Sequence, residues 1–435
     1  MQFRSTRSHT TEVSFKDAVL RCLPPDGGLY VPSSVPDMRQ FFLYMDEKTT
    51  YPELVASVTP SLLQGELNPF SASRVAESAF DFEPELIRLD EDFSVLNLYN
   101  GPSGVFKDFG IAFFGAVLEE LLKNSGQAMI VSAARSDTGP CLANSFRKRN
   151  GITSVLIYPS GPVYGLDNRE FVPNGGNIIP IQIKGSFDEC QKLIAELIND
   201  RPFAQRHNVT SANSVNPCCL LPQAFYYFYA FIKIKKYLAG KDLVFSVPSG
   251  NFGNFISGLY AWKFGMPVNG FIAAMNKNDA FGNYIRGSGF SPNHPLATCS
   301  PALDIAHPVN YERLVSFYEE APAVMRNMVF PASIDDETTL RTMEWAWKTW
   351  QILLDPHGAV AFAAARKFMG EGARDRHCIV LATGHPAIEA EIVRRATGQI
   401  AVLPEKLNNL KKHADPIAVI DPYLDALESA IASCF

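Results

Sequence analysis

Short apolar runs alternate with helical patterns from about residue 95 to the end of the chain, and this rhythm constrains the fold more than any other feature. Each run is brief and partly β-branched, as in strands that are buried on both faces. The runs are AMIVSA (128–133), SVLIYP (154–159), LVFSV (243–247), GFIAAM (270–275) and CIVLAT (378–383). Helical patterns occupy 108–123, 186–199, 218–237, 253–264, 336–351 and 357–369. The alternation predicts βαβ units, and therefore an α/β fold with mostly parallel sheets.

Composition excludes several classes of protein. The 435 residues suit two or three domains, and a hydrophobic fraction of 47% with 19% charged residues is typical of a compact globular protein. A net charge of −6 argues against a general binder of nucleic-acid phosphates. The eight cysteines show no metal-ligand spacing, so we expect free thiols and no metal site. No signal segment or membrane span is predicted, which indicates a cytoplasmic protein without a membrane partner.

The loop after the run LVFSV has the composition of an anion site. It reads PSGNFGNF (248–255) and leads into a helical pattern. Gly250 and Gly253 let backbone N–H groups approach a ligand closely, and the helix dipole favours negative charge there. Ser249 and Asn251 can add side-chain donors. The loop is neither GxxxxGK[ST] nor GxGxxG, so it predicts a phosphate site without specifying a nucleotide. A Gly-rich turn that binds nothing is the alternative.

Two further loops follow predicted strands, where ligands bind in such folds. ARSDTGPCLAN is small and polar, and its Asp137 and Thr138 suit the N-cap of a helix. Thr383 ends another predicted strand. His385, two residues later, is more typical of a capping or packing histidine than of a catalytic one.

Lys107 stands in an unusual setting for a lysine. In GPSGVFKDFG (101–110) it follows a Gly/Pro turn and begins a helical pattern whose other residues are mostly apolar. A buried lysine is costly unless it is paired or neutralised, and a snorkelling lysine is the ordinary alternative. A lysine in an apolar pocket can instead form a Schiff base with an aldehyde. Such a lysine upstream of a phosphate loop predicts an aldehyde that carries a phosphate, and pyridoxal 5′-phosphate (PLP) has both groups.

Twelve patterns, including those above, span nearly the whole chain in order: VSFKDAVLRCLPPDGGLYVP, GPSGVFKDFG, SDTG, LIYPSG, GGNI, GSFDECQ, TSANSVN, LPQAFYYFYA, VPSGNFGN, NKND, DPHGA and TGHPA. Together they resemble the threonine synthase family, PLP enzymes of the tryptophan-synthase-β fold type (fold type II). The resemblance implies two open α/β lobes with mostly parallel sheets and an N-terminal helical region. We place an N-terminal helical cap at 1–95, the lobe that carries the lysine at 96–240, and the lobe with the phosphate loop and C-terminal helices at 241–435.

The resemblance also implies roles for individual residues. Lys107 matches the catalytic lysine, which carries PLP as a Schiff base and later acts as a base. The residues that match the cofactor-phosphate loop are Ser249, Gly250, Asn251, Phe252, Gly253 and Asn254. Thr383 matches the partner of the pyridine nitrogen, and Asp137 the residue near the 3′-hydroxyl of the cofactor. The residues expected to bind substrate are Ser103, Arg135, Ser136, Thr138 and Asn216.

The implied activity is a PLP-dependent carbon–oxygen lyase reaction of threonine biosynthesis. O-phospho-L-homoserine and water give L-threonine and phosphate, by γ-elimination followed by addition of water at Cβ. The substrate is then a small phosphorylated amino acid, and its leaving phosphate needs a cationic pocket. The resemblance implies no nucleic-acid partner, and we expect a monomer or a homodimer.

The chain departs from the family on the substrate side of the site. The substituted positions are Asn100 for His, Ser103 for Thr, Ser160 and Pro162 for Lys, Tyr164 for Ser, Asp167 for Gln, Asn168 for Glu, Cys219 for Arg and Ile388 for Lys. A bidentate Arg–phosphate contact is strong, and neither Cys nor Pro replaces it, although Arg135 is a new cation. Three hypotheses follow: a threonine synthase with a rearranged pocket, a related PLP enzyme with a changed amino-acid substrate, and a catalytically idle homologue that binds a ligand or a partner.

Overall fold

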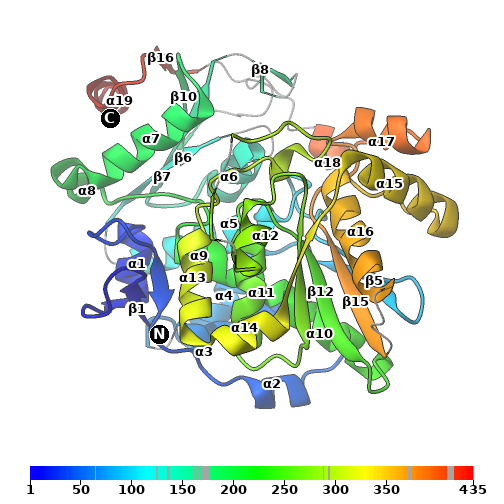
Figure 1. Ribbon diagram of the computed structural model, residues 1–435. Helices are drawn as coiled ribbons and strands as arrows, with labels where there is room; N and C mark the ends of the chain where they lie inside the picture. Colours follow the sequence, from blue (N-terminus) through cyan, green and yellow to red (C-terminus); the bar gives the residue numbers. More distant parts are fainter. Residues whose placement is uncertain are drawn as a thin grey trace.

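Two sheets organise the computed structural model of the chain (Figure 1). The structure describes residues 1–63, 65–123, 126–134, 138–160, 162–163, 166–167, 176–287, 289–291, 294–370, 375–408 and 416–434. The five-stranded sheet is parallel, in the order β11 (Val209–Thr210), β6 (Ala128–Ala133), β7 (Ile152–Pro159), β10 (Ile178–Ile183) and β16 (Ala418–Ile420). The six-stranded sheet has the order β14 (Val329–Ser333), β13 (Gly270–Met275), β12 (Asp242–Pro248), β15 (Arg376–Ala382), β5 (Phe93–Asn97) and β4 (Glu85–Arg88). Its neighbours are parallel except β4 and β5, so the predicted α/β fold is confirmed.

The predicted elements are present with small differences in their bounds. The five apolar runs form β6, β7, β12, β13 and β15. Helical patterns form α5 (Lys107–Leu122), α7 (Phe187–Asn199), α11 (Gly253–Lys263), α15 (Asp336–Trp350) and α16 (Pro356–Gly370). The helical pattern over 218–237 is also helical in the structure, but it divides into α9 (Pro217–Leu220), η2 (Leu221–Gln223), α10 (Ala224–Ile234) and η3 (Lys235–Tyr237). Pro222 has no N–H group to continue the helical bonding, which accounts for the break after α9.

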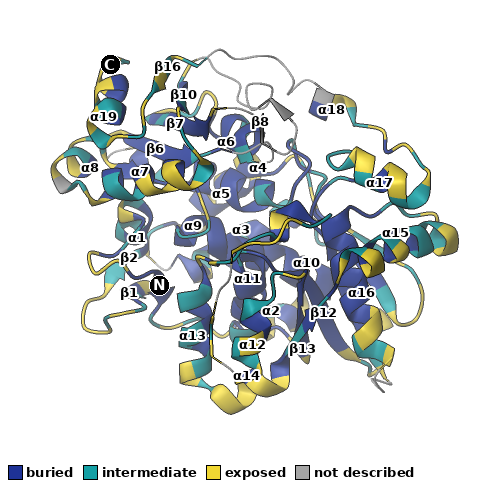
Figure 2. Cartoon of the chain, turned by 45° about the horizontal axis from the view of Figure 1, so that its top comes forward, coloured by how far each residue is buried: buried dark blue, intermediate teal, exposed yellow. Residues whose placement is uncertain are grey.

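Side chains that alternate along the strands build separate cores on the two faces of each sheet. On β12, Val244 packs in the cluster of α16, and Phe245 packs in the larger cluster of α10 and α11. On β6, Val131 packs with α7, whereas Ile130 joins the same larger cluster, together with α5 and α6 (Thr138–Phe146). The largest core therefore lies between the sheets, and Figure 2 shows its strands and helices in the colour of buried residues.

The N-terminal region combines helices with a small sheet. Its antiparallel strands are β1 (Gln2–Ser5), β2 (Val13–Ser14) and β3 (Tyr30–Pro32), and its helices are α1 (Phe15–Arg21), α2 (Arg39–Tyr44), α3 (Tyr51–Leu62) and α4 (Pro69–Ala79). Thr50 and Glu53 form a capping box that starts α3, and Asn68 caps α4. The helical cap of the prediction thus has a three-stranded sheet beside it. Figure 1 shows β1 and α1 near α13 (Tyr311–Glu320).

The sheets draw on segments from distant parts of the chain. Strand β5 pairs with β15, and β16 near the C-terminus pairs with β10. The division at 95 and 240 stays a prediction. The remaining elements are β8 (Pro162–Val163), β9 (Leu166–Asp167), α8 (Arg201–His207), α12 (Ala280–Ile285), η4 (Pro301–Leu303), α14 (Pro322–Met328), α17 (Ala390–Thr397), α18 (Glu405–Asn408) and α19 (Leu424–Ala432). Among the described helices, none combines the length and apolar character that a membrane span needs.

A buried histidine gives the fold a testable pH dependence. On β15, His377 donates from Nδ1 to the Glu91 carbonyl oxygen (2.9 Å), and in the neutral ring its Nε2 accepts from the Ser94 hydroxyl (2.8 Å). Burial lowers the pKa of His377 below its ordinary value of 6.5. Between these two pKa values the unfolded chain binds the proton more readily, so the contribution of this group to stability is present above pH 6.5 and decreases as pH falls below it.

We expect His377→Gln to flatten this dependence. Wild-type protein should lose at most about 1.4 kcal/mol of unfolding free energy per pH unit from this group, and the variant should lose less. The variant should also be less stable at neutral pH by about 1 kcal/mol, because buried hydrogen bonds are disturbed. Urea unfolding near pH 7 and near pH 5.5 measures both effects, with exposed His9→Gln as the control. Parallel pH profiles for wild type and His377→Gln would contradict the assignment.

Candidate active site

The segment before Lys107 pairs with the loop that follows β15. The Phe106 N–H donates to the Thr383 carbonyl oxygen at 2.9 Å, and the His385 N–H donates to the Gly104 carbonyl oxygen at 2.8 Å. A β-bridge joins Val105 to Gly384 between these two bonds. The start of α5 is therefore fixed at the carboxyl end of β15, where parallel sheets of this kind bind ligands.

Lys107 reaches a second loop as well. Its side chain is half-buried, and Nζ donates to the Thr138 hydroxyl at 2.9 Å. Thr138 begins α6, the helix that follows β6 of the other sheet. The lysine thus lies where loops of both sheets meet. Arg135, Ser136 and Asp137, which were predicted in the same loop, lie outside the described residues.

A buried carboxylate beside the lysine was missed from the sequence. Asp108 is fully buried and accepts from the Ser103 N–H (2.9 Å) and the Ser103 hydroxyl (2.7 Å). A Cβ at Gly101 would lie 2.4 Å from the Asp108 carboxylate, so glycine is needed for this contact. The signal was an acid next to a lysine within an apolar helix. Since the Ser103 hydroxyl already donates to Asp108, the substrate contact expected of Ser103 stays a prediction.

The loop at 248–255, predicted to bind phosphate, presents donors that no described residue satisfies. It runs from the end of β12 to the start of α11, and Phe252 takes the left-handed conformation with φ of 59°. Among the described residues, none accepts a hydrogen bond from the backbone N–H groups of 250–255. The side-chain Nδ2 of Asn254 is also buried without a partner, while its Oδ1 accepts from the hydroxyls of Tyr226 (2.6 Å) and Tyr227 (2.7 Å). Unpaired donors at a helix N-terminus fit an anion such as phosphate.

Neighbouring segments hold this loop in place. The Asn251 side chain donates from Nδ2 to the Ser214 hydroxyl (3.2 Å) and accepts at Oδ1 from the Val309 N–H (2.6 Å). The Ser249 hydroxyl donates to the Val247 carbonyl oxygen at 2.8 Å. Both side chains therefore stabilise the loop, and the backbone with Asn254 offers the free donors.

A buried acid–histidine pair supports the loop at 248–255 through Ala302, which packs against Gly250. The carboxylate of Asp355 accepts from His357 Nδ1 at 2.6 Å. On the other side of the ring, Nε2 accepts from the Ala302 N–H at 3.1 Å, so His357 is the neutral Nδ1–H tautomer. Ala302 in turn packs against Gly250, because a Cβ there would lie 2.9 Å from the Ala302 carbonyl oxygen. The pattern DPHGA contains this pair, but the sequence alone does not indicate what it contacts.

Thr383 fits the position expected for a partner of a cofactor ring. It is 8% exposed, and among the described residues none bonds to its hydroxyl. His385 nearby accepts from the Ala387 N–H at Nδ1 (3.1 Å) and packs edge-on against Tyr99. These contacts fit the capping and packing expected of His385.

The substituted positions on the substrate side offer little charge. Cys219 lies buried against α5, and burial raises the pKa of its thiol, so it stays neutral. The Asn216 amide donates to the Val19 carbonyl oxygen (3.0 Å) and the Thr210 hydroxyl (3.1 Å), which favours a structural role and leaves its substrate contact a prediction. The Ser160 hydroxyl donates to the Ile183 carbonyl oxygen. Tyr164 and Asn168 lie outside the described residues, as do the side chains of Pro162 and Asp167.

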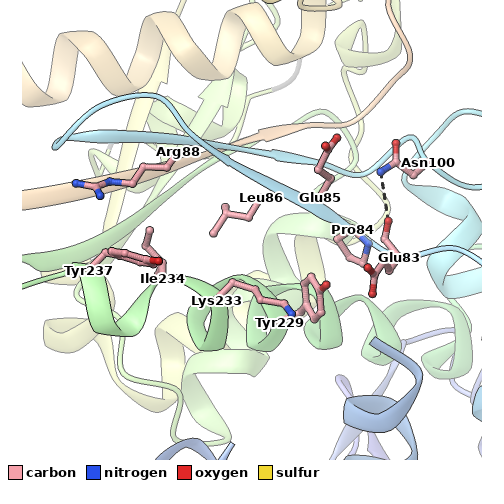
Figure 3. Close-up of a pocket in the computed structure, with 10 residues that line it drawn as sticks. All are labelled: Glu83, Pro84, Glu85, Leu86, Arg88, Asn100, Tyr229, Lys233, Ile234 and Tyr237. Carbon is pink, nitrogen blue, oxygen red and sulfur yellow. Dashed lines mark hydrogen bonds between the residues drawn. The ribbon is translucent and has the colours of Figure 1, made fainter. Parts of the chain in front are cut away.

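A separate groove of about 620 Å³ lies between β4 and α10 (Figure 3). Asn100 reaches it and donates to the Glu83 carbonyl oxygen at 3.3 Å. Its lysine, Lys233, donates to carbonyl oxygens of the 47–49 turn, and Glu85 accepts from Asn97. Lys107, Thr383 and the phosphate loop do not line this groove, so we assign the site to the loops.

Comparison with known families agrees with this arrangement. The family described as "Pyridoxal-phosphate dependent enzyme" matches residues 88–384, so the fold and the site define a PLP-dependent enzyme of fold type II. "Threonine synthase N terminus" matches residues 2–80, and "Threonine synthase, C-terminal" matches residues 358–431. The chain belongs to the threonine synthase family.

Similarity to individual relatives extends over nearly the whole chain. Threonine synthase of Buchnera aphidicola from Acyrthosiphon pisum is 31% identical over 94% of both chains. The crystal structure of threonine synthase from Escherichia coli covers 100% of both chains at 29% identity, with a TM-score of 0.88. The PLP-bound threonine synthase of Brucella melitensis covers 100% of this chain and 99% of that chain at 27% identity, with a TM-score of 0.90.

Proposed function

We propose that this chain is a threonine synthase, which converts O-phospho-L-homoserine and water to L-threonine and phosphate. The observation that carries the proposal is the meeting of three loops: the start of α5 with Lys107, the start of α6 with Thr138, and the loop after β15 with Thr383. Relatives that are named threonine synthase and match 94% of this chain support the same reaction. Family membership favours this reading over a changed substrate or an idle homologue.

The residues at the site fit PLP. Lys107 would bind the aldehyde carbon, and the N–H groups of 250–255 with Asn254 would bind the phosphate. Thr383 would donate to or accept from the ring nitrogen through its hydroxyl. Bound PLP supplies an electron sink that stabilises negative charge on substrate carbons. Asp137 is proposed near the 3′-hydroxyl from the sequence.

Lys107 is proposed to move protons in the reaction. Its Nζ would take one proton from Cα and then one from Cβ, so that the phosphate can leave from Cγ. Protons then return to Cγ and Cα, and water adds its hydroxyl at Cβ while its own proton goes to the released phosphate. The Thr138 hydroxyl accepts from Nζ at 2.9 Å and would orient the amine between these atoms. Asp108 accepts two hydrogen bonds from Ser103 and thereby stabilises the turn before Lys107, so the backbone that carries the amine is held in place.

The leaving phosphate needs cations that this chain arranges differently from its family. Cys219 and Ile388 stand at positions where the family pattern has Arg and Lys. We propose that Arg135, with Ser136 and Thr138, binds the substrate phosphate from the loop before α6. We further propose a cytoplasmic enzyme that acts as a monomer or a homodimer.

A substrate panel tests the proposal. Protein loaded with PLP should convert O-phospho-L-homoserine to equal amounts of threonine and phosphate. Amino-acid analysis measures the threonine, and ³¹P NMR measures the phosphate. O-phosphoserine, O-phosphothreonine and O-acetylhomoserine should react far more slowly. Turnover of one of these without threonine formation from phosphohomoserine would show a changed substrate, and no product from any compound would show an idle homologue.

A further inference from the structure

Arg313 on α13 is a fully buried arginine whose hydrogen bonds all go to neutral oxygens. Its Nε and Nη2 donate to the Tyr30 carbonyl oxygen (3.1 and 3.0 Å), and Nη2 also donates to the Val215 carbonyl oxygen (2.6 Å). Its Nη1 donates to the Ser214 carbonyl oxygen (2.6 Å) and to the Asn310 side-chain oxygen (2.7 Å). Among the described residues, none with a carboxylate forms an ion pair with it.

A buried charge without a counterion is costly, so its position requires a reason. The neighbouring acid, Glu312, pairs with Arg7 on the surface and raises the pKa of Arg313 less than burial lowers it. Burial lowers the pKa of Arg313 to about 10, which leaves the guanidinium charged at neutral pH. Carbonyl dipoles satisfy its donors, but the net positive charge remains.

Two short paths of hydrogen bonds join Arg313 to the phosphate loop. Asn310 accepts from the guanidinium and donates to the Asn251 carbonyl oxygen at 3.1 Å. The backbone of Ser214 accepts from the guanidinium, and its hydroxyl accepts from both Asn310 (2.9 Å) and Asn251 (3.2 Å). A Cβ at Gly253 would lie 3.0 Å from the Ser214 Cβ, so these residues also pack against the start of α11.

The loop itself has unsatisfied donors and no charged side chain. Its residues are Ser249, Gly250, Asn251, Phe252, Gly253 and Asn254. A dianionic phosphate placed there has no cation in the loop to neutralise it. Arg313 is connected to this loop through Asn310 and Ser214, and among the described residues it has no ion-pair partner. Opposite charges attract more strongly in a low-dielectric interior than in water.

We propose that Arg313 is a positioning residue for the cofactor phosphate: it fixes the loop through Asn310 and Ser214, and its buried positive charge is balanced when the phosphate binds. The Tyr30 contact also ties the N-terminal region to the loop. The inference rests on the proposed PLP site. It concerns binding of the phosphate group and does not depend on which amino acid reacts.

The affinity for PLP is compared with that for pyridoxal, which lacks the phosphate. A residue that acts on the phosphate affects only the first affinity, whereas a general structural residue affects both. Cofactor-free protein is titrated with each compound, and the visible absorption of the bound form is measured. Arg313→Gln should weaken PLP binding at least about tenfold, which corresponds to about 1.4 kcal/mol, and should leave pyridoxal binding nearly unchanged. Arg313→Lys keeps the charge and should lose less affinity for PLP. Exposed Arg326→Gln on α14 is the matched control and should behave as wild type.

A second variant keeps the test decisive where Arg313→Gln fails to fold. Asn310→Asp places a carboxylate 2.7 Å from Nη1, which neutralises the arginine, and it also removes the Nδ2 donations to the Asn251 carbonyl oxygen and the Ser214 hydroxyl. It should lower the affinity for PLP and spare that for pyridoxal. Equal losses for both compounds, or no loss in either variant, would overturn the proposal. If wild type shows the PLP preference but makes no threonine, the proposed function fails and this inference stands; if wild type binds no PLP, both fail.

Discussion

Lys107→Ala is expected to abolish threonine formation and the visible absorption of bound PLP together. The bridge between Val105 and Gly384 holds the start of α5 against the loop after β15, and the Lys107 amine donates from there to the Thr138 hydroxyl. Loss of the covalent attachment and of the catalytic base should lower kcat by about 10³-fold or more. Absorption spectra and a threonine assay on the same sample measure both effects.

The control for this variant lies just beyond the other end of the same helix. Lys123 follows the end of α5 and pairs with Glu120 at the surface. Lys123→Ala should keep both the absorption and the activity. Urea unfolding should show that Lys107→Ala folds with near wild-type stability, because one half-buried hydrogen bond is lost. A Lys107→Ala protein that stays yellow and active would place the chemistry on another residue.

Gly250→Ala is expected to disrupt the phosphate loop without touching any ligand-binding side chain. A Cβ at this position would lie 2.9 Å from both the Ala302 carbonyl oxygen and the Leu303 Cα. This backbone cannot yield easily, because His357 holds the Ala302 N–H and is itself held by Asp355. The loop must move instead, and this displaces the unpaired N–H groups of 250–255 that are proposed to bind the phosphate. We expect PLP affinity to fall at least about tenfold, with a stability loss of about 1–3 kcal/mol.

Gly370→Ala provides the comparison for this change. Gly370 ends α16, and a Cβ there would meet no atom of the described residues within 4 Å. Its PLP affinity and urea midpoint should match those of wild type. Wild-type PLP affinity in Gly250→Ala would show that the loop tolerates displacement and would weaken its assignment as the phosphate site.

The fold could be predicted well where local pattern decides structure. The runs that became β6 and β13 are apolar on both faces, so their bounds follow from composition alone. Strands β5 and β16 were missed, because each is short and gains its stability from a partner distant in the sequence. The break at Pro222 was also missed, since apolar residues continue the helical pattern on both sides of it.

The loops that form the site could be predicted from the sequence, but the hydrogen bonds that hold these loops in place could not. Lys107 and the loop at 248–255 have local signatures in residue type, and both could be found from the sequence. Asp355, His357 and Arg313 have no such signature. The support that they give to the loop depends on contacts of His357 and Arg313 with residues more than 50 positions away. A buried arginine in particular looks like any surface arginine of an amphipathic helix until the packing is known.

The fate of oxygen atoms tests the proposed reaction most directly. O-phospho-L-homoserine is incubated with PLP-loaded protein in ¹⁸O-labelled water, and the products are analysed by mass spectrometry. Cleavage at Cγ with addition of water at Cβ predicts that the label enters the hydroxyl of threonine while the released phosphate stays unlabelled. Labelled phosphate accompanied by homoserine, or the absence of threonine, would contradict the assignment of this chain as a threonine synthase.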